Sequence, residues 1–126
     1  MSKKAIHTEK APKAIGPYSQ AIESGPFLFV SGQIPVDPAT GEIVSGGIEE
    51  QTKQVFRNLK AILKEAGLTE GGIVKTTVFL KSLEDFATVN KLYAEVFTVP
   101  FPARSCIEVS ALPKGARIEM EAIVER

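Results

Sequence analysis

The chain contains no tryptophan, one cysteine and one histidine among its 126 residues. A zinc centre takes several cysteine or histidine ligands, so a single residue of each kind excludes one. A lone cysteine also excludes a disulfide within the chain, and small secreted domains usually depend on several. We therefore expect a protein that binds no metal. We also expect it in a reducing compartment, the cytoplasm.

An excess of charge of one sign is also lacking, because 15 basic residues balance 15 acidic ones. Nucleic-acid-binding domains are usually basic and stack bases on aromatic rings, which here make up only 7% of the residues. The longest purely aliphatic or aromatic run, FLFV, is far shorter than the roughly 20 residues that cross a bilayer. The composition therefore disfavours nucleic acid and membrane as partners.

Repeats, low-complexity tracts and linker-like segments are absent from the sequence as well. The hydrophobic share of 44% and the charged share of 24% are ordinary for a globular protein. A chain of this length has enough material for one hydrophobic core. We expect a single domain over residues 1–126.

Two segments have the spacing of amphipathic helices. In the first, residues 48–67, Gly67 stands where a C-terminal cap belongs. Its apolar side chains recur three, four or seven positions apart: Ile48, Val55, Leu59, Ile62 and Ala66.

The second helix is expected over residues 82–97, with Ser82 as N-cap and Asp85 three residues later. One inward stripe follows: Phe86, Val89, Tyr93 and Phe97. Asn90 lies four residues after Phe86 and is expected on the same inward face.

Six segments have the β-branched and aromatic composition of strands. They are residues 4–9, 18–24, 27–33, 73–81, 104–112 and 117–125. The sequence ESGPF predicts a hairpin turn between the second and third. The order β-β-β-α-β-α-β-β predicts an α+β fold, with two helices on one face of a mixed or antiparallel sheet.

The expected sheet is apolar on both faces. FLFV is apolar throughout, and alternation places Val78 and Leu80 on one face and Ile73 and Phe79 on the other. Two helices cover only one face, so a second copy of the chain is expected to cover the other. Simple exposure of a few apolar residues is the alternative.

The last two expected strands carry polar side chains where core is usual. Alternation places Arg104 and Cys106 on one side of their strand, and Glu119 and Glu121 together on theirs. If these strands pair through residues 111–116, the four side chains form one polar face. Charged groups on a covered face must be paired or bind a ligand.

Each of these residues has a chemical and a structural interpretation. Arg104 can bind a carboxylate through two parallel donors, or form an ion pair with Glu108, Glu119 or Glu121. Glu119 can act as a general base, or as half of a structural salt bridge. Cys106 can be a nucleophile or a small core residue, and only His7 is available as its base, which disfavours the nucleophile.

Five segments resemble the RidA family, also called YjgF/YER057c/UK114, the reactive intermediate deaminases. They are AIGPYSQA (14–21), VSGQIPVDPATGEIV (30–44), QTKQVFRNLKAILKEAG (51–67), VNKLYAEVF (89–97) and PARSCIEVSALPKGARIEMEAI (102–123). The last block is the most specific, because it contains the arginine, the cysteine and the downstream glutamate.

The resemblance implies a chorismate-mutase-like α+β fold with about six strands and two helices on one face. It also implies a homotrimer with clefts between subunits, and hydrolysis of 2-enamino and 2-imino acids, such as 2-aminoacrylate and 2-iminobutanoate, to 2-keto acids and ammonia. No cofactor is implied, because an imine carbon is already electrophilic and needs mainly orientation and a placed water.

The resemblance also implies the site residues. Arg104 binds the substrate carboxylate and Glu119 activates the attacking water. The remaining substrate-binding positions are Tyr18, Ser31, Gly32, Asn90 and the backbone around Cys106. Two other functions described for relatives stay open: a ribonuclease or translation inhibitor, and a keto-acid-sensing or chaperone-like protein without turnover.

Overall fold

A computed structural model describes residues 2–126, so Met1, the first residue of the expected domain, lies outside the described part. A six-stranded sheet has the spatial order β1-β2-β3-β8-β6-β7. Its strands are β1 Lys4–Ile6, β2 Ala21–Ser24, β3 Phe27–Gln33, β6 Ile73–Leu80, β7 Ala103–Glu108 and β8 Ile118–Glu125. Neighbouring strands are antiparallel except β6 and β7, which run parallel.

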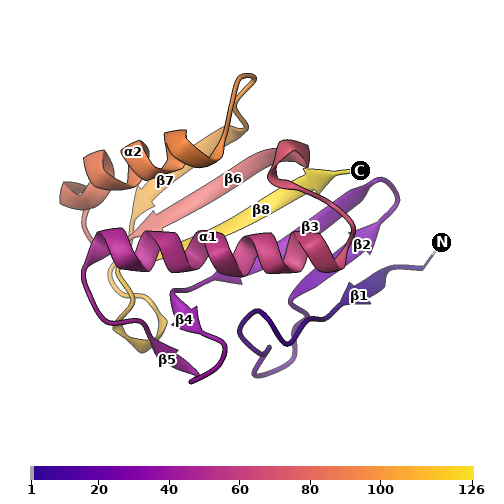
Figure 1. The fold of residues 1–126 in the computed structure, drawn as a ribbon, viewed down its shortest axis with the longest axis horizontal. Coiled ribbons are helices and arrows are strands. Elements are labelled where there is room, and N and C mark those ends of the chain that lie inside the picture. Colours follow the sequence, from indigo (N-terminus) through magenta and orange to yellow (C-terminus); the bar gives the residue numbers. More distant parts are fainter. Residues whose placement is uncertain (1) are drawn as a thin grey trace.

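Two helices, α1 (Ile48–Glu65) and α2 (Phe86–Val96), lie on the same side of this sheet (Figure 1). The expected α+β fold is therefore confirmed, with a mixed sheet. The ESGPF hairpin is confirmed too, since β2 and β3 pair antiparallel around Gly25, whose φ is +59°. A ribbon of two strands, β4 (Val36–Asp37) and β5 (Glu42–Ile43), was not predicted, because strands of two residues leave no periodic pattern. Three 3₁₀ turns complete the elements: Glu70–Gly72, Leu83–Asp85 and Pro113–Gly115.

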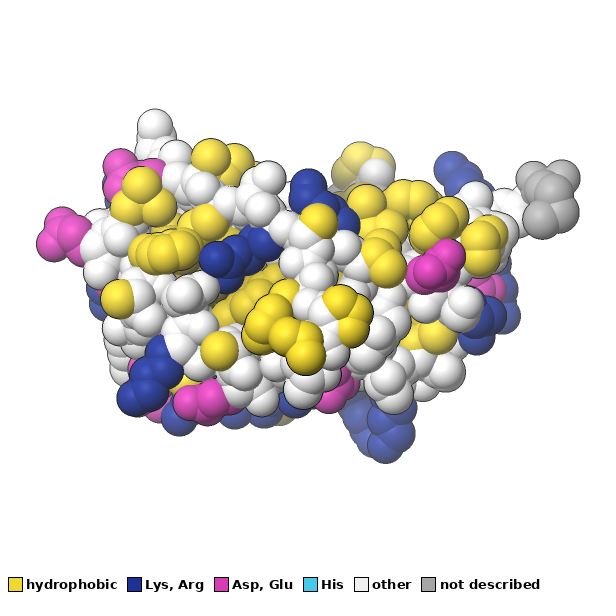
Figure 2. Space-filling model, turned by 90° about the horizontal axis from the view of Figure 1, so that it is seen from above, with side chains coloured by type: hydrophobic (Ala, Val, Ile, Leu, Met, Phe, Trp, Pro, Cys, Tyr) yellow, Lys and Arg dark blue, Asp and Glu magenta, His cyan; other side chains and the backbone are white. Residues whose placement is uncertain are grey.

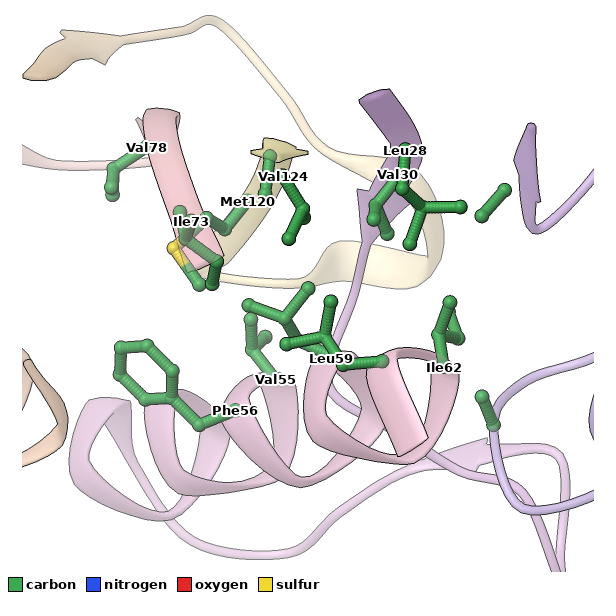
Figure 3. Close-up of a cluster of buried hydrophobic side chains, with 14 of the residues drawn as sticks. Leu28, Val30, Val55, Phe56, Leu59, Ile62, Ile73, Val78, Met120 and Val124 are labelled. Carbon is green, nitrogen blue, oxygen red and sulfur yellow. The ribbon is translucent and has the colours of Figure 1, made fainter. Parts of the chain in front are cut away.

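Helix α1 follows its expected pattern closely. It ends before Gly67, whose φ of +73° allows the Leu68 N–H to return to the Leu63 carbonyl at 2.8 Å. Its apolar stripe packs against the sheet, as Figure 3 shows. The labelled core residues from α1 are Val55, Phe56, Leu59 and Ile62, and those from the sheet are Leu28, Val30, Ile73, Val78, Met120 and Val124.

Helix α2 differs from the prediction at its beginning. Ser82 caps the short 3₁₀ turn, accepting from the Glu84 N–H at 3.2 Å, and α2 itself starts at Phe86. Asp85 makes no capping bond, because both its oxygens accept from Arg117. Asn90 is exposed, so its expected place on the inward face was wrong.

The face of the sheet away from the helices carries exposed apolar side chains, as expected, among polar and charged ones. Phe29 and Ile107 are 44% and 47% exposed there, and Phe79 lies beside Ile107 in the β6–β7 register. The expected position of Ile73 on this face was wrong. A register irregularity between Ile73 and Lys75 turns the Ile73 side chain into the core on the helix side. We call this uncovered side the open face.

Among residues 2–126, no helix combines the length and the apolar character needed to cross a membrane.

Candidate functional site

The four polar side chains of the last two strands do not share a face, which corrects the expectation from the sequence. Strands β7 and β8 are not neighbours, because β6 lies between them. Cys106 aligns with Val78 and Met120, and so faces the helices together with Arg104. Glu119 aligns with Phe79 and faces the other way, onto the open face. One chain therefore presents two separate polar clusters.

The first cluster is built around Arg104, where β7 meets α2. The Arg104 Nη1 donates to the Asn90 Oδ1 at 2.8 Å. The guanidinium carbon lies 4.7 Å from the centre of the Tyr93 ring and 5.5 Å from that of Phe86. Aromatic faces and an amide oxygen hold the cation without neutralising it.

No acid within residues 2–126 pairs with Arg104. The ion pair with Glu108, Glu119 or Glu121 that the sequence left open is thus not formed within the chain. Glu108 instead accepts from the Leu83 N–H at 2.8 Å. The remaining guanidinium donors are free for an incoming anion, and a bidentate carboxylate suits their geometry.

A hollow of about 380 Å³ opens beside this cation. Its lining residues are Asn90, Tyr93, Ala94, Phe101, Pro102 and Arg104. Viewed from above, the surface shows exposed hydrophobic side chains close to Lys and Arg side chains (Figure 2). An apolar wall with one positive group fits a small organic acid better than a hydrated ion.

Cys106 lies two residues beyond Arg104 on the same strand, half-buried and free. Burial raises the pKa of the Cys106 thiol, and the Arg104 charge lowers it by less. The side chain therefore stays a protonated thiol at neutral pH, which is the weaker nucleophile. This environment favours the small core residue over the nucleophile.

The second cluster is on the open face, where Glu119 lies against Gly32 at the end of β3. A side chain at position 32 would overlap the Glu119 carboxylate, so glycine is required for this approach. Burial raises the pKa of Glu119, and the negative charge of Glu121 raises it further. A carboxylate with a raised pKa accepts a proton more readily, as a general base must.

Two more expected site residues lie beside Gly32. The Ser31 Oγ donates to the Ser19 carbonyl at 2.6 Å, so its hydroxyl meets a ligand as an acceptor. Tyr18 is 53% exposed on the loop that precedes β2. A hollow of about 560 Å³ lies between this loop and the β4–β5 ribbon, and Tyr18 and Gly32 both line it.

The structure therefore sorts the expected residues into two groups: Arg104, Asn90 and Cys106 on the helix side, and Glu119, Gly32, Ser31 and Tyr18 on the other. The sequence reasoning missed Phe86 and Tyr93 as partners of the cation. Tyr93 is in the core as expected, but Phe86 is 37% exposed, so its expected place in the buried stripe was wrong. Their spacing with Asn90, four and then three residues, is the signal that places all three along one side of α2. Among the described residues there is no group of three or more acids, histidines or cysteines that suits a metal ion.

The fold and these clusters define an α+β protein of the Rid type, with an arginine and a glutamate on opposite faces of one sheet. Residues 8–126 match the model of the family described as Endoribonuclease L-PSP, and the chain belongs to this family, which is the RidA family that its motifs resemble.

Individual relatives agree over nearly the whole chain. A RutC family protein of Pyrococcus abyssi is 62% identical, covering 98% of this chain and 97% of its own. The 2-iminobutanoate/2-iminopropanoate deaminase of Escherichia coli is 55% identical, covering 98% of both chains. A crystal structure of the Rid family protein YyfA from Yersinia pestis superposes with a TM-score of 0.96 at 51% identity, covering 99% of this chain and 100% of that one.

Proposed function

We propose that this protein is a 2-iminobutanoate/2-iminopropanoate deaminase, a cytoplasmic hydrolase that converts reactive 2-imino acids to 2-keto acids and ammonia. The observation that carries the proposal is the uncompensated guanidinium of Arg104, held by Asn90 and two aromatic rings beside an open hollow. A 2-imino acid supplies the carboxylate that this cation lacks. The name of the E. coli relative supports the choice of substrate class.

The working site is assembled between two copies of the chain. Arg104 and Glu119 face opposite sides of one sheet, so a small substrate held by the first does not meet the second within one chain. The exposed apolar side chains of the open face, with Phe29 and Ile107 about half exposed, supply the surface on which copies associate. A closed ring of three copies, a homotrimer, brings each Arg104 to the Glu119 of its neighbour.

The reaction uses water as its nucleophile. Arg104 fixes the substrate carboxylate, and the Glu119 of the neighbouring copy takes a proton as the oxygen of water bonds to the imine carbon. The product of this addition is a carbinolamine. Glu119 returns this proton to the nitrogen, and then carries the hydroxyl proton of the carbinolamine to the same nitrogen as the carbon–nitrogen bond breaks, so that ammonia and the keto acid leave. An enamine substrate such as 2-aminoacrylate enters after it tautomerises to the imine.

Two smaller contributions complete the site. Ser31 accepts from the substrate N–H, because its own proton is held by Ser19. The backbone around Cys106 contacts the bound acid, while its thiol stays unreactive because burial raises the thiol pKa. The chemistry needs neither a metal nor a cofactor, since the imine is electrophilic by itself.

The experiment couples this protein to a dehydratase that releases 2-aminoacrylate or its homologue, and measures ammonia and keto acid. We expect both products to form faster than by spontaneous hydrolysis. Equal rates with and without the protein, with a keto acid still bound at Arg104, would instead favour a sensor of keto acids without turnover.

The intersubunit arrangement has a separate test. Arg104→Ala and Glu119→Gln subunits are unfolded together and refolded as a mixture. About a quarter of the sites then combine an intact Arg104 with an intact Glu119 from the neighbour, so about a quarter of wild-type activity returns. A site within one chain recovers nothing on mixing. Light scattering should give three times the mass of the chain for the active species.

A further inference from the structure

We propose that Gln20 is a positioning residue, which holds the loop of Tyr18 at the substrate site by tying both ends of that loop together. Gln20 is outside the residues assigned to the reaction, and its side chain is only 2% exposed. The inference rests on the proposed function for the role of Tyr18, and on hydrogen bonds alone for the role of Gln20.

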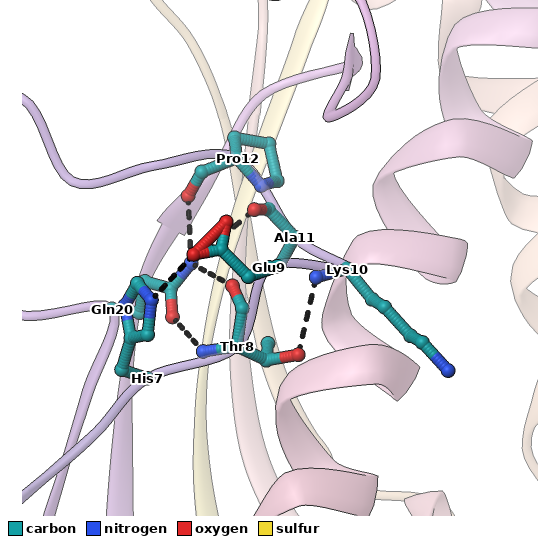
Figure 4. Close-up of polar contacts among 7 residues, drawn as sticks. All are labelled: His7, Thr8, Glu9, Lys10, Ala11, Pro12 and Gln20. Atoms are coloured by element: carbon teal, nitrogen blue, oxygen red, sulfur yellow. Dashed lines mark hydrogen bonds and ion pairs between the residues drawn. The ribbon is translucent and has the colours of Figure 1, made fainter.

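The amide of Gln20 uses both its nitrogen and its oxygen to hydrogen-bond one short segment, as Figure 4 shows. Its Oε1 accepts from the Thr8 N–H at 2.8 Å. Its Nε2 lies 3.0 Å from the Thr8 carbonyl, 3.3 Å from that of Ala11 and 2.8 Å from that of Pro12. A single buried side chain thus fixes residues 8–12, which form no helix or strand.

The backbone of the same residue fixes the other end of the loop. The Ser31 N–H donates to the Gln20 carbonyl at 3.0 Å, and the Ser31 hydroxyl donates to the neighbouring Ser19 carbonyl. Ser31 in turn precedes Gly32, against which Glu119 lies. Gln20 therefore links the start of the loop to the strand that carries the second polar cluster.

Residues 13–18 lie between these two attachments and are mostly exposed. Within them Gly16 has a φ of +115°, and Tyr18 lines the hollow together with Gly32. Exposed segments of this kind gain little from packing, so their conformation depends on how their ends are held. Loss of the Gln20 amide frees the segment from residue 8 onwards and leaves Tyr18 beside the site for less of the time.

The test compares wild type with Gln20→Met, which keeps the size of the side chain but neither donates nor accepts as an amide does. We expect KM for the imino acid to rise about three- to tenfold with kcat changed less than twofold, because one set of neutral hydrogen bonds is lost. Gln54→Met is the matched control, since Gln54 is also a buried glutamine, and its hydrogen bonds go to Arg57 and Asn58 on its own helix.

A double-mutant cycle separates positioning from general destabilisation. In a Tyr18→Ala background, Gln20→Met should raise KM no further, because Gln20 acts through Tyr18. An equal rise in both backgrounds would overturn the proposal.

Two readouts do not depend on turnover. Trypsin should cleave after Lys10 and Lys13 faster in Gln20→Met than in wild type or in the control, and unchanged cleavage would overturn the proposal. In the wild-type protein, bound 2-oxobutanoate should slow hydrogen exchange at the Thr8 amide. This measurement needs no variant, so it remains informative even if Gln20→Met does not fold. If a bound keto acid left this hydrogen exchange unchanged, the proposed link between the Gln20 hydrogen bonds and the substrate site would be contradicted. If the wild-type protein were inactive but these two readouts came out as expected, the deaminase proposal would be wrong and the proposed role of Gln20 in holding the loop would remain.

Discussion

The two polar clusters differ in how the chain keeps a charged group ready for a ligand. Arg104 is a permanent cation on the helix side, held by the rings of Phe86 and Tyr93 and by the Asn90 oxygen. Glu119 is a titratable acid on the open face, whose burial and acidic neighbour raise its pKa. The first arrangement keeps a permanent charge, as the proposed binding role requires, and the second raises the proton affinity of a carboxylate, as the proposed base role requires.

Because of this difference, the two clusters should respond to different kinds of substitution. Binding through Arg104 depends on charge and fork geometry. The proposed base chemistry of Glu119 depends on its proton affinity and on the space that Gly32 leaves for it. Each of the following changes alters one of these properties.

Glu119→Gln should have the largest effect, because the amide keeps the shape of the side chain but cannot take a proton from water. The loss expected for removing a general base is about 10²- to 10⁴-fold in kcat, with ligand binding retained. Glu121→Gln is the control on the same strand face and should cost far less. A fully active Glu119→Gln protein would reduce Glu119 to a structural role.

Arg104→Ala should come next, because it removes the cation of the helix-side cluster. A hydrogen bond to a charged group contributes about 1.5–3 kcal/mol, so kcat/KM should fall about ten- to a hundredfold. Arg104→Lys keeps the charge without the planar fork and should restore only part of the loss. Arg57→Ala, which removes an exposed arginine from α1, is the control, and a comparable loss there would contradict a specific role for Arg104.

Gly32→Ala tests whether the space beside Glu119 matters. The new methyl group overlaps the carboxylate and displaces it, while the backbone at this position needs no left-handed conformation. We expect about a tenfold loss of kcat from the misplaced base, with little change in thermal stability. Gly71→Ala, where an added Cβ meets only ordinary contacts, should leave kcat unchanged. Wild-type kcat in Gly32→Ala would mean that the carboxylate position is not critical.

The raised pKa of Glu119 also predicts a pH dependence of stability. The folded carboxyl holds its proton to higher pH than the unfolded one, so the folded state binds more protons between the ordinary glutamate pKa and the raised value. The free energy of unfolding therefore falls as pH rises through that window. Glu119→Gln should remove this decline, which urea unfolding across the window measures at fixed protein concentration. A decline of equal size in the variant would assign it to other groups.

Cys106→Ala should have the smallest effect on catalysis, because water is the nucleophile in the proposed mechanism and burial raises the pKa of the thiol. We expect activity within about twofold of wild type and a modest loss of stability from the smaller side chain. If mass spectrometry of the wild-type protein during turnover found a covalent adduct on the thiol, the prediction would be wrong and Cys106 would be the nucleophile.

Much of the fold could be predicted from local sequence patterns. A period of about 3.6 located both helices, because each buries one apolar stripe, and β-branched and aromatic composition located all six strands of the main sheet. The patterns also indicated that apolar side chains lie on the open face. They missed the β4–β5 ribbon and the start of α2, where two-residue strands and the Asp85–Arg117 contact leave no periodic signal.

The sequence by itself determined the candidate site residues, because the motif that resembles the RidA family contains Arg104, Cys106 and Glu119 and its residue types and spacing are local properties. Only the tertiary structure decided on which side of the sheet each one lies. Strand β6, about thirty residues earlier in the chain, pairs between β7 and β8 and separates the arginine from the glutamate. Strand order depends on contacts distant in sequence, and no local period encodes it.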